Sequence, residues 1–125
     1  MSADSSAIVT AFCREFDAPA PDAERLAAYF AEDAVYHNIP MQPVNGRAAI
    51  AAVLGGMTKT MQSAGWEVKH QVAEGGMVMN ERVDRFKIGD KLVAIPVTGV
   101  FEVRAGKIAA WRDYFDLATW QNQLK

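Results

Sequence analysis

The spacing of apolar residues changes once along the chain. Up to about residue 62 they recur every three or four positions, which is the period of a helix buried along one face. From Trp66 onward they alternate with polar residues, which is the period of a strand with one buried face. Runs of helices followed by antiparallel strands predict the α+β class, with helices covering one face of a curved sheet.

Two helices are predicted at the start of the chain. Ser5 or Ser6 can cap the first helix, and it ends before Pro19, because proline cannot continue a helix. Asp22 opens the second helix, whose apolar stripe continues to Phe30. Both helices therefore present one apolar face to a common core.

A strand and a third helix are predicted next. The strand covers residues 34–38 and leads into a proline-rich loop at 40–46. The helix covers 47–62 and carries Gly55-Gly56 in its middle. Because glycine weakens a helix interior, this pair predicts a kink or a close backbone contact.

The rest of the chain is predicted to form a four-strand meander and a closing helix. Turns at Gly75-Gly76, Gly89-Asp90 and residues 105–107 separate the strands. Pro96 predicts a bulge or an edge position, and Asp116 is suited to cap the last helix. The predicted strands cover 66–72, 77–86, 92–104 and 108–115.

The composition excludes several classes of protein. The chain has 125 residues, half of them hydrophobic, which predicts one ordered domain over residues 1–125. Its net charge is −2 and it has no basic run, so no nucleic-acid partner is expected. A single cysteine, Cys13, excludes an internal disulfide framework and suits a reducing compartment. With neither a signal-peptide pattern nor a membrane-spanning apolar run, we expect a cytoplasmic protein without a membrane partner.

Several sequence motifs that are typical of particular enzyme classes are absent. There is no HExxH, and His37 and His70 have no metal-ligand spacing, so no metal site is expected. The GxSxG elbow of serine hydrolases is missing. Neither GxGxxG nor GxxxxGK[ST] occurs, so no dinucleotide or phosphate-loop cofactor site is predicted.

Three charged residues are predicted to lie among apolar neighbours on strand faces. Arg82 and Asp84 share one face with Phe86, and Asp113 shares a face with Trp111. Burying a carboxylate is costly unless it is paired, and the planar guanidinium of an arginine can serve two carboxylates at once. The residues alone leave two interpretations open: a structural salt bridge, or a site for acid–base chemistry.

A second polar group is predicted on the short strand. Tyr36 and Asn38 point to one face, and His37 points to the other. A phenol and an amide two residues apart can hold a water molecule between them. A buried tyrosine bonded to the backbone is the alternative interpretation.

Three segments together resemble the limonene-1,2-epoxide hydrolase family, in order and spacing from about Phe12 to Trp120. The resemblance implies a cystatin-like, nuclear-transport-factor-2-like cone with a strongly curved mixed sheet and helices that enclose a deep apolar pocket. It also implies a homodimer and no cofactor. The segments are Tyr36-His37-Asn38-Ile39-Pro40, Glu81-Arg82-Val83-Asp84 and Trp111-Arg112-Asp113-Tyr114-Phe115-Asp116.

The resemblance also implies a reaction and the roles of the residues. Asp113 would be the general base, Asp84 the general acid and Arg82 the bridge between them, while Tyr36 and Asn38 help to hold the attacking water. A small apolar epoxide would become a vicinal diol in one step, without a covalent intermediate. A ketosteroid-isomerase-like isomerase and a non-catalytic domain for a small ligand are the alternatives. Implied substrate-binding positions are Phe16, Met57, Met61, Phe86, Ile95, Val97, Phe115 and Trp120.

Overall fold

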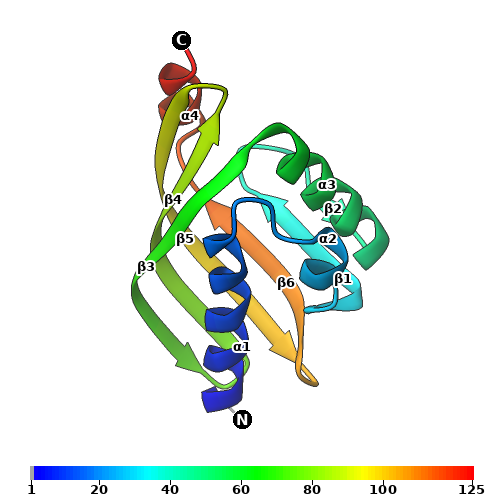
Figure 1. Ribbon diagram of the computed structural model, residues 1–125. Coiled ribbons are helices and arrows are strands. Elements are labelled where there is room, and N and C mark those ends of the chain that lie inside the picture. The colour runs from blue at the N-terminus through cyan, green and yellow to red at the C-terminus, as the bar shows by residue number, and fades with distance from the viewer. Residues whose placement is uncertain (1) are drawn as a thin grey trace.

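The computed structural model describes residues 2–125, with side chains from Ser5 onward. Six strands form one mixed sheet in the order β2-β1-β6-β5-β4-β3 (Figure 1). The strands are β1 (Phe30–Asn38), β2 (Val44–Asn45), β3 (Gln62–Glu74), β4 (Met77–Ile88), β5 (Lys91–Arg104) and β6 (Lys107–Tyr114).

The predicted four-strand meander is confirmed. Strands β3 to β6 pair antiparallel in chain order, and β1 joins the free side of β6 in parallel. Ala105 and Gly106 both have positive φ values, 51° and 78°, as the tight hairpin between β5 and β6 requires. The parallel pairing of β1 and β6 has a consequence for the site, because it sets Asn38 beside Asp113.

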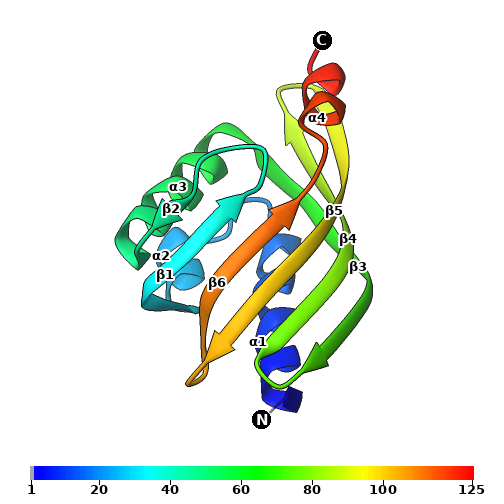
Figure 2. The same ribbon diagram turned by 180° about the vertical axis from the view of Figure 1, so that it is seen from behind.

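Of the four α-helices, three cover one face of the sheet and the last lies at one end of it (Figures 1 and 2). The helix α1 is already formed at Ser2, so Ser5 and Ser6 lie inside it and the predicted cap was wrong. In α3, a methyl group at Gly55 would lie 3.4 Å from the side-chain Cβ of Ala23, an ordinary van der Waals distance, and one at Gly56 would meet nothing within 4 Å, so neither glycine marks a close contact with a neighbouring backbone. The helices are α1 (Ser2–Arg14), the 3₁₀ helix η1 (Glu15–Asp17), α2 (Ala23–Ala27), α3 (Arg47–Thr60) and α4 (Leu117–Gln123).

The second helix is shorter than its apolar stripe predicted. Asp22 caps it as expected, with Oδ1 accepting from the backbone N–H of Glu24 at 3.2 Å. Phe30, however, is the first residue of β1 rather than the end of the helix. Its ring is fully buried and lies edge-on to Phe12, with ring centroids 5.3 Å apart. Packing against the core therefore overrides the helical period at this point.

Pro96 lies where β5 has a strand on one side only. Its partner on β4 is Val83, whereas pairing with β6 starts at Thr98. The predicted edge position is confirmed, and the register with β4 continues through the proline without a bulge. The amide of Gln123 in α4 bonds both the N–H and the C=O of Ala94, each at 2.8 Å, and so covers this edge.

Candidate active site

The polar cluster is built by the alternation of β4 and by two strand pairings. Asn80, Arg82 and Asp84 all face the helix-covered side of β4 and are at most 4% exposed. Asp113 of β6 faces the same side, one strand further on. The predicted shared faces are therefore confirmed, and β5 is the strand that lies between the two acids.

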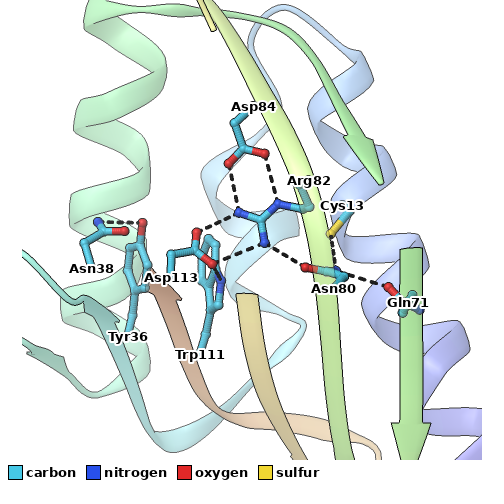
Figure 3. A network of polar contacts seen from close by, with 9 residues as sticks. All are labelled: Cys13, Tyr36, Asn38, Gln71, Asn80, Arg82, Asp84, Trp111 and Asp113. Carbon is cyan, nitrogen blue, oxygen red and sulfur yellow. Dashed lines mark hydrogen bonds and ion pairs between the residues drawn. The ribbon is translucent and has the colours of Figure 1, made fainter. Parts of the chain in front are cut away.

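Arg82 bridges the two acids, as Figure 3 shows. Its Nε and Nη2 donate to Oδ1 and Oδ2 of Asp84 at 2.9 and 2.8 Å. Its Nη1 and Nη2 donate to Oδ1 and Oδ2 of Asp113 at 3.2 and 2.7 Å. Two forked, charge-assisted contacts of this kind hold both carboxyl groups in fixed orientations.

Gly99 makes the bridge possible, and the sequence reading missed it. On β5 this glycine pairs with Asn80 on one side and Asp113 on the other. A methyl group there would lie 2.4 Å from Nη1 of Arg82 and 3.0 Å from Oδ1 of Asp113. The guanidinium therefore crosses β5 over the one position that has no side chain. An isolated glycine inside a predicted strand was the available signal.

The two acids differ in their surroundings. Burial raises the pKa of Asp84 to about 6, and the charge of Arg82 offsets only part of that effect. Among the described residues, the side chain of Asp84 receives hydrogen bonds from Arg82 alone, whereas Asp113 also accepts one from Nε1 of Trp111 at 2.7 Å. A single negative charge on the two carboxyl groups together would balance Arg82 and leave the buried cluster electrically neutral, which limits its desolvation cost.

Arg82 itself stays charged. Burial alone lowers its pKa, but the charges of Asp113 and Asp84 raise it well above the ordinary value. The guanidinium carbon also lies 4.8 Å from the ring centroid of Trp66, a favourable cation–π position. The arginine is thus a fixed positive charge and not a proton donor.

Tyr36 and Asn38 reach the cluster from β1. Their partners on β6 are Trp111 and Asp113, and the rings of Tyr36 and Trp111 stack with centroids 4.1 Å apart. Nδ2 of Asn38 donates to the Tyr36 hydroxyl at 2.9 Å, which leaves the phenolic proton free to be donated elsewhere. Burial, and next the charge of Asp113, raise the pKa of Tyr36 well above its ordinary value, so it remains a phenol.

A cavity of about 160 Å³ opens next to the cluster. Both acids, Tyr36 and Asn38 line it, so the structure brings these four predicted residues together, with Arg82 behind them. Met41 in the loop after β1, Trp66 within β3 and Leu117 at the start of α4 also line it and were not predicted, because periodicity marks a buried face without showing which of its residues reach a cavity. Seven of the implied substrate positions lie in its wall: Met57, Met61, Phe86, Ile95, Val97, Phe115 and Trp120.

Phe16, one of the implied substrate-binding positions, does not lie in the cavity wall. It lies in η1, is fully buried and does not line the cavity. Its ring stacks on Trp66 with centroids 3.7 Å apart, so the indole stands in the wall where Phe16 was expected. The stacking supports the wall from behind, and Phe16 is therefore a core residue.

A larger hollow of about 760 Å³ lies on the outer side of α1, and it is open to solvent. Its lining includes Arg25 and Glu15, which form an ion pair at 2.7 Å. None of the acids, amides or hydroxyls of the polar cluster reaches it. The small apolar cavity is therefore the site that the chemistry favours.

This arrangement defines the class of cone-shaped α+β proteins in which helices close a curved sheet over a cavity. Among solved structures, a hypothetical protein from Catenulispora acidiphila with a ketosteroid isomerase-like fold, crystallised with trimethylamine, superposes with a TM-score of 0.81. It is 21% identical in sequence, and the match covers 93% of this chain and 90% of that one. The predicted nuclear-transport-factor-2-like fold is confirmed. No helix among the described residues is long and apolar enough to span a membrane.

The chain belongs to the limonene-1,2-epoxide hydrolase family, whose catalytic-domain model matches residues 4–125. It is 39% identical over 99 residues to the epoxide hydrolase EphG of Mycobacterium tuberculosis, an alignment that covers 77% of this chain and 64% of that protein's length. It also superposes on an LEH-like epoxide hydrolase structure from M. tuberculosis with a TM-score of 0.86 and 30% identity. That match covers 98% of this chain and 90% of the other.

Proposed function

We propose that this protein is an epoxide hydrolase that adds water to a small apolar epoxide to give a vicinal diol. One observation carries the proposal: a buried arginine bridges two carboxyl groups at the polar end of an apolar cavity, and burial raises the pKa of one of them, Asp84, to about 6. Family membership and the similarity to EphG support the same activity.

The attacking water is proposed to sit between Asp113, Tyr36 and Asn38. Oδ2 of Asp113 receives one hydrogen bond, from Arg82, whereas Oδ1 already receives two, so Oδ2 is the better acceptor for a water proton. The phenol donates to the water oxygen, and the amide oxygen of Asn38 accepts the second water proton. One lone pair of the water then remains for the epoxide carbon.

Ring opening is proposed to occur in one step with two proton transfers. Asp113 takes a proton from the water while the water oxygen bonds to one ring carbon. The bond from that carbon to the ring oxygen breaks, and Asp84 gives its proton to that oxygen. When the diol leaves, Asp113 loses its proton and Asp84 regains one through solvent. Arg82 keeps its charge throughout, and the two acids titrate as a coupled pair.

The cavity supports a small apolar substrate such as a cyclic or terpene-like epoxide. Apart from the four polar residues, its wall is formed by methionine, aliphatic and aromatic side chains. Phe86 and Trp120 meet edge to face there, with centroids 5.8 Å apart, and limit the width. An isomerase of the ketosteroid type fits less well, because that chemistry would use an isolated base facing a neutral oxyanion donor, whereas Arg82 bridges two acids here.

The test is turnover of a panel of terpene, cyclohexene and styrene oxides by the purified protein. We expect diol formation that Asp84→Asn and Asp113→Asn each abolish while circular dichroism shows a folded chain. A ketosteroid in the same panel tests the isomerase. Binding of epoxides without diol formation would leave only a ligand-binding domain and would overturn the proposal.

We further propose that the protein forms a homodimer through the outer face of the sheet and acts in the cytoplasm. Exposed apolar side chains support this surface: Met79 on β4 and its register partner Val72 on β3 are 45% and 68% exposed. Light scattering should give twice the chain mass, and Met79→Lys should lower it. The buried single thiol of Cys13 suits a reducing compartment.

A further inference from the structure

The hydrogen bonds of Arg82 do not end at the two acids. Nη1 also donates to Oδ1 of Asn80 at 3.1 Å, so each of the five N–H groups of the guanidinium has an acceptor. Asn80 is 3% exposed and precedes Arg82 by two residues on the same face of β4. It does not line the cavity, so any effect of Asn80 on a bound substrate passes through Arg82.

The orientation of the Asn80 amide is set from helix α1. Nε2 of Gln71 donates to the backbone oxygen of Ser6 at 3.1 Å and to the hydroxyls of Ser6 and Thr10 at 2.8 and 3.0 Å. Because a backbone oxygen can only accept, Gln71 turns its own side-chain oxygen toward Asn80, whose Nδ2 donates to it at 3.1 Å. Asn80 is then left with its oxygen facing Arg82.

Cys13 completes the surroundings of this amide, as the right-hand part of Figure 3 shows. Its Sγ lies 3.8 Å from Nδ2 of Asn80. Burial raises the pKa of the Cys13 thiol to about 12, so it stays neutral and does not compete with the acids for Arg82. A chain of contacts thus runs from α1 through Gln71 and Asn80 to the arginine, although α1 contributes no described side chain to the cavity wall.

We propose that Asn80 and Gln71 are positioning residues that fix the rotation of the Arg82 guanidinium and so decide how its charge is shared between Asp84 and Asp113. The proposal rests on the proposed hydrolase function for its kinetic consequences. Without an acceptor at position 80, one N–H of a planar, buried group loses its partner. The remaining acceptor beside Nη1 is Asp113, so the guanidinium rotates toward Asp113, and this rotation lengthens its contacts to Asp84.

The kinetic test compares Asn80→Leu and Gln71→Leu with Gln62→Leu, a matched substitution on β3 at an exposed position far from the network. We expect kcat to fall about 30-fold for Asn80→Leu and about fivefold for Gln71→Leu, with KM within twofold of wild type. Gln62→Leu should leave both constants unchanged. The alkaline limb of the pH–rate profile should move to higher pH in the first two variants, because the charge of Arg82 then lowers the pKa of Asp84 less.

Two further measurements distinguish the positioning of Arg82 from the proposed hydrolase function. The double variant should be no slower than Asn80→Leu, because both residues act along one path. A ¹³C NMR titration of labelled aspartates should show Asp84 titrating at higher pH in both single variants, whether or not the protein turns over any epoxide. Such a shift without turnover would support positioning and refute the hydrolase function. The side chain of Gln71 is half-buried, so Gln71→Leu is expected to fold. If the titration of Asp84 and the pH–rate profile were both unchanged in this variant, the proposal would be overturned.

Discussion

Strand β6 takes part in two arginine–carboxylate contacts that lie on opposite faces of the sheet. On the inner face, Asp113 meets Arg82 at 2.7 Å, and the two side chains are 5% and 0% exposed. On the outer face, the neighbouring residue Arg112 meets Glu102 at 2.6 Å, with exposures of 30% and 46%. The distances are almost equal, so geometry alone does not separate a reactive pair from a structural one.

The difference lies in what surrounds each contact. Solvent screens the outer pair, and such pairs contribute roughly 0–1 kcal/mol to stability. The inner cluster includes a second acid that burial holds at a pKa of about 6, and it faces an apolar cavity. Burial therefore turns a common surface motif into a group that can hold and release a proton near neutral pH.

The largest effect is expected from Asp113→Asn. The amide keeps the shape of the side chain but cannot take a proton from water, so kcat/KM should fall by about ten-thousandfold, as loss of a general base often does. Steady-state kinetics on the best epoxide of the panel measures it. If more than a tenth of the activity survived, another group would have to be the base.

Gly99→Ala should produce the next largest effect, because its methyl group would push Nη1 of Arg82 away from both Asn80 and Asp113. We expect a loss of at least 100-fold in kcat and about 1–3 kcal/mol in the free energy of unfolding, as overpacking of a well-filled interior costs. The matched control is Gly56→Ala in α3, where a methyl group meets nothing within 4 Å. That variant should keep full activity and gain up to about 1 kcal/mol. Equal activity in the two variants would show that Arg82 does not need the gap.

Asp84 should make the protein less stable as the pH rises. Its pKa is raised in the folded state, so folding binds its proton more tightly between about pH 4 and pH 6, and the stability that this contributes is lost as the pH passes through about 6. Each pKa unit corresponds to ~1.4 kcal/mol, so wild type should lose about 3 kcal/mol relative to Asp84→Asn between pH 4 and pH 7. Urea unfolding of both proteins at several pH values measures this. If the free energy of unfolding changed with pH in the same way in both proteins, burial would not raise the pKa of Asp84.

The smallest effect is expected on the outer face. Glu102→Gln removes the charge of the exposed pair while keeping its shape. We expect a change of less than about 1 kcal/mol in the free energy of unfolding and kcat within twofold of wild type. A large loss of activity would show that the exposed pair on the outer face of β6 affects the buried cluster on its inner face.

Much of the fold and of the polar cluster could be predicted from the sequence, because alternation within a strand is a local property. It placed Arg82 and Asp84 on one buried face and Asp113 on another. The contribution of Gly99 could not be predicted in this way, since it depends on which residues two neighbouring strands bring beside it. Phe30 was misassigned because packing against Phe12 decides its conformation.

Side-chain networks between distant segments were also beyond reach. The contact of Gln71 with Thr10 joins residues 61 positions apart, and neither residue type signals it. The family resemblance implied that Phe16 lines the pocket, but the ring of Trp66 stacks on it and forms that part of the cavity wall. In both cases the outcome depends on three-dimensional packing and not on periodicity.

A single turnover in ¹⁸O-water shows whether Asp113 activates a water molecule that attacks the epoxide itself. With enzyme in excess over epoxide, every diol molecule formed in the first turnover should carry one ¹⁸O atom, and the protein should carry none. An unlabelled diol, together with ¹⁸O in the carboxyl group of Asp84 or Asp113, would show that a carboxylate attacks the ring. That result would contradict the direct-water mechanism.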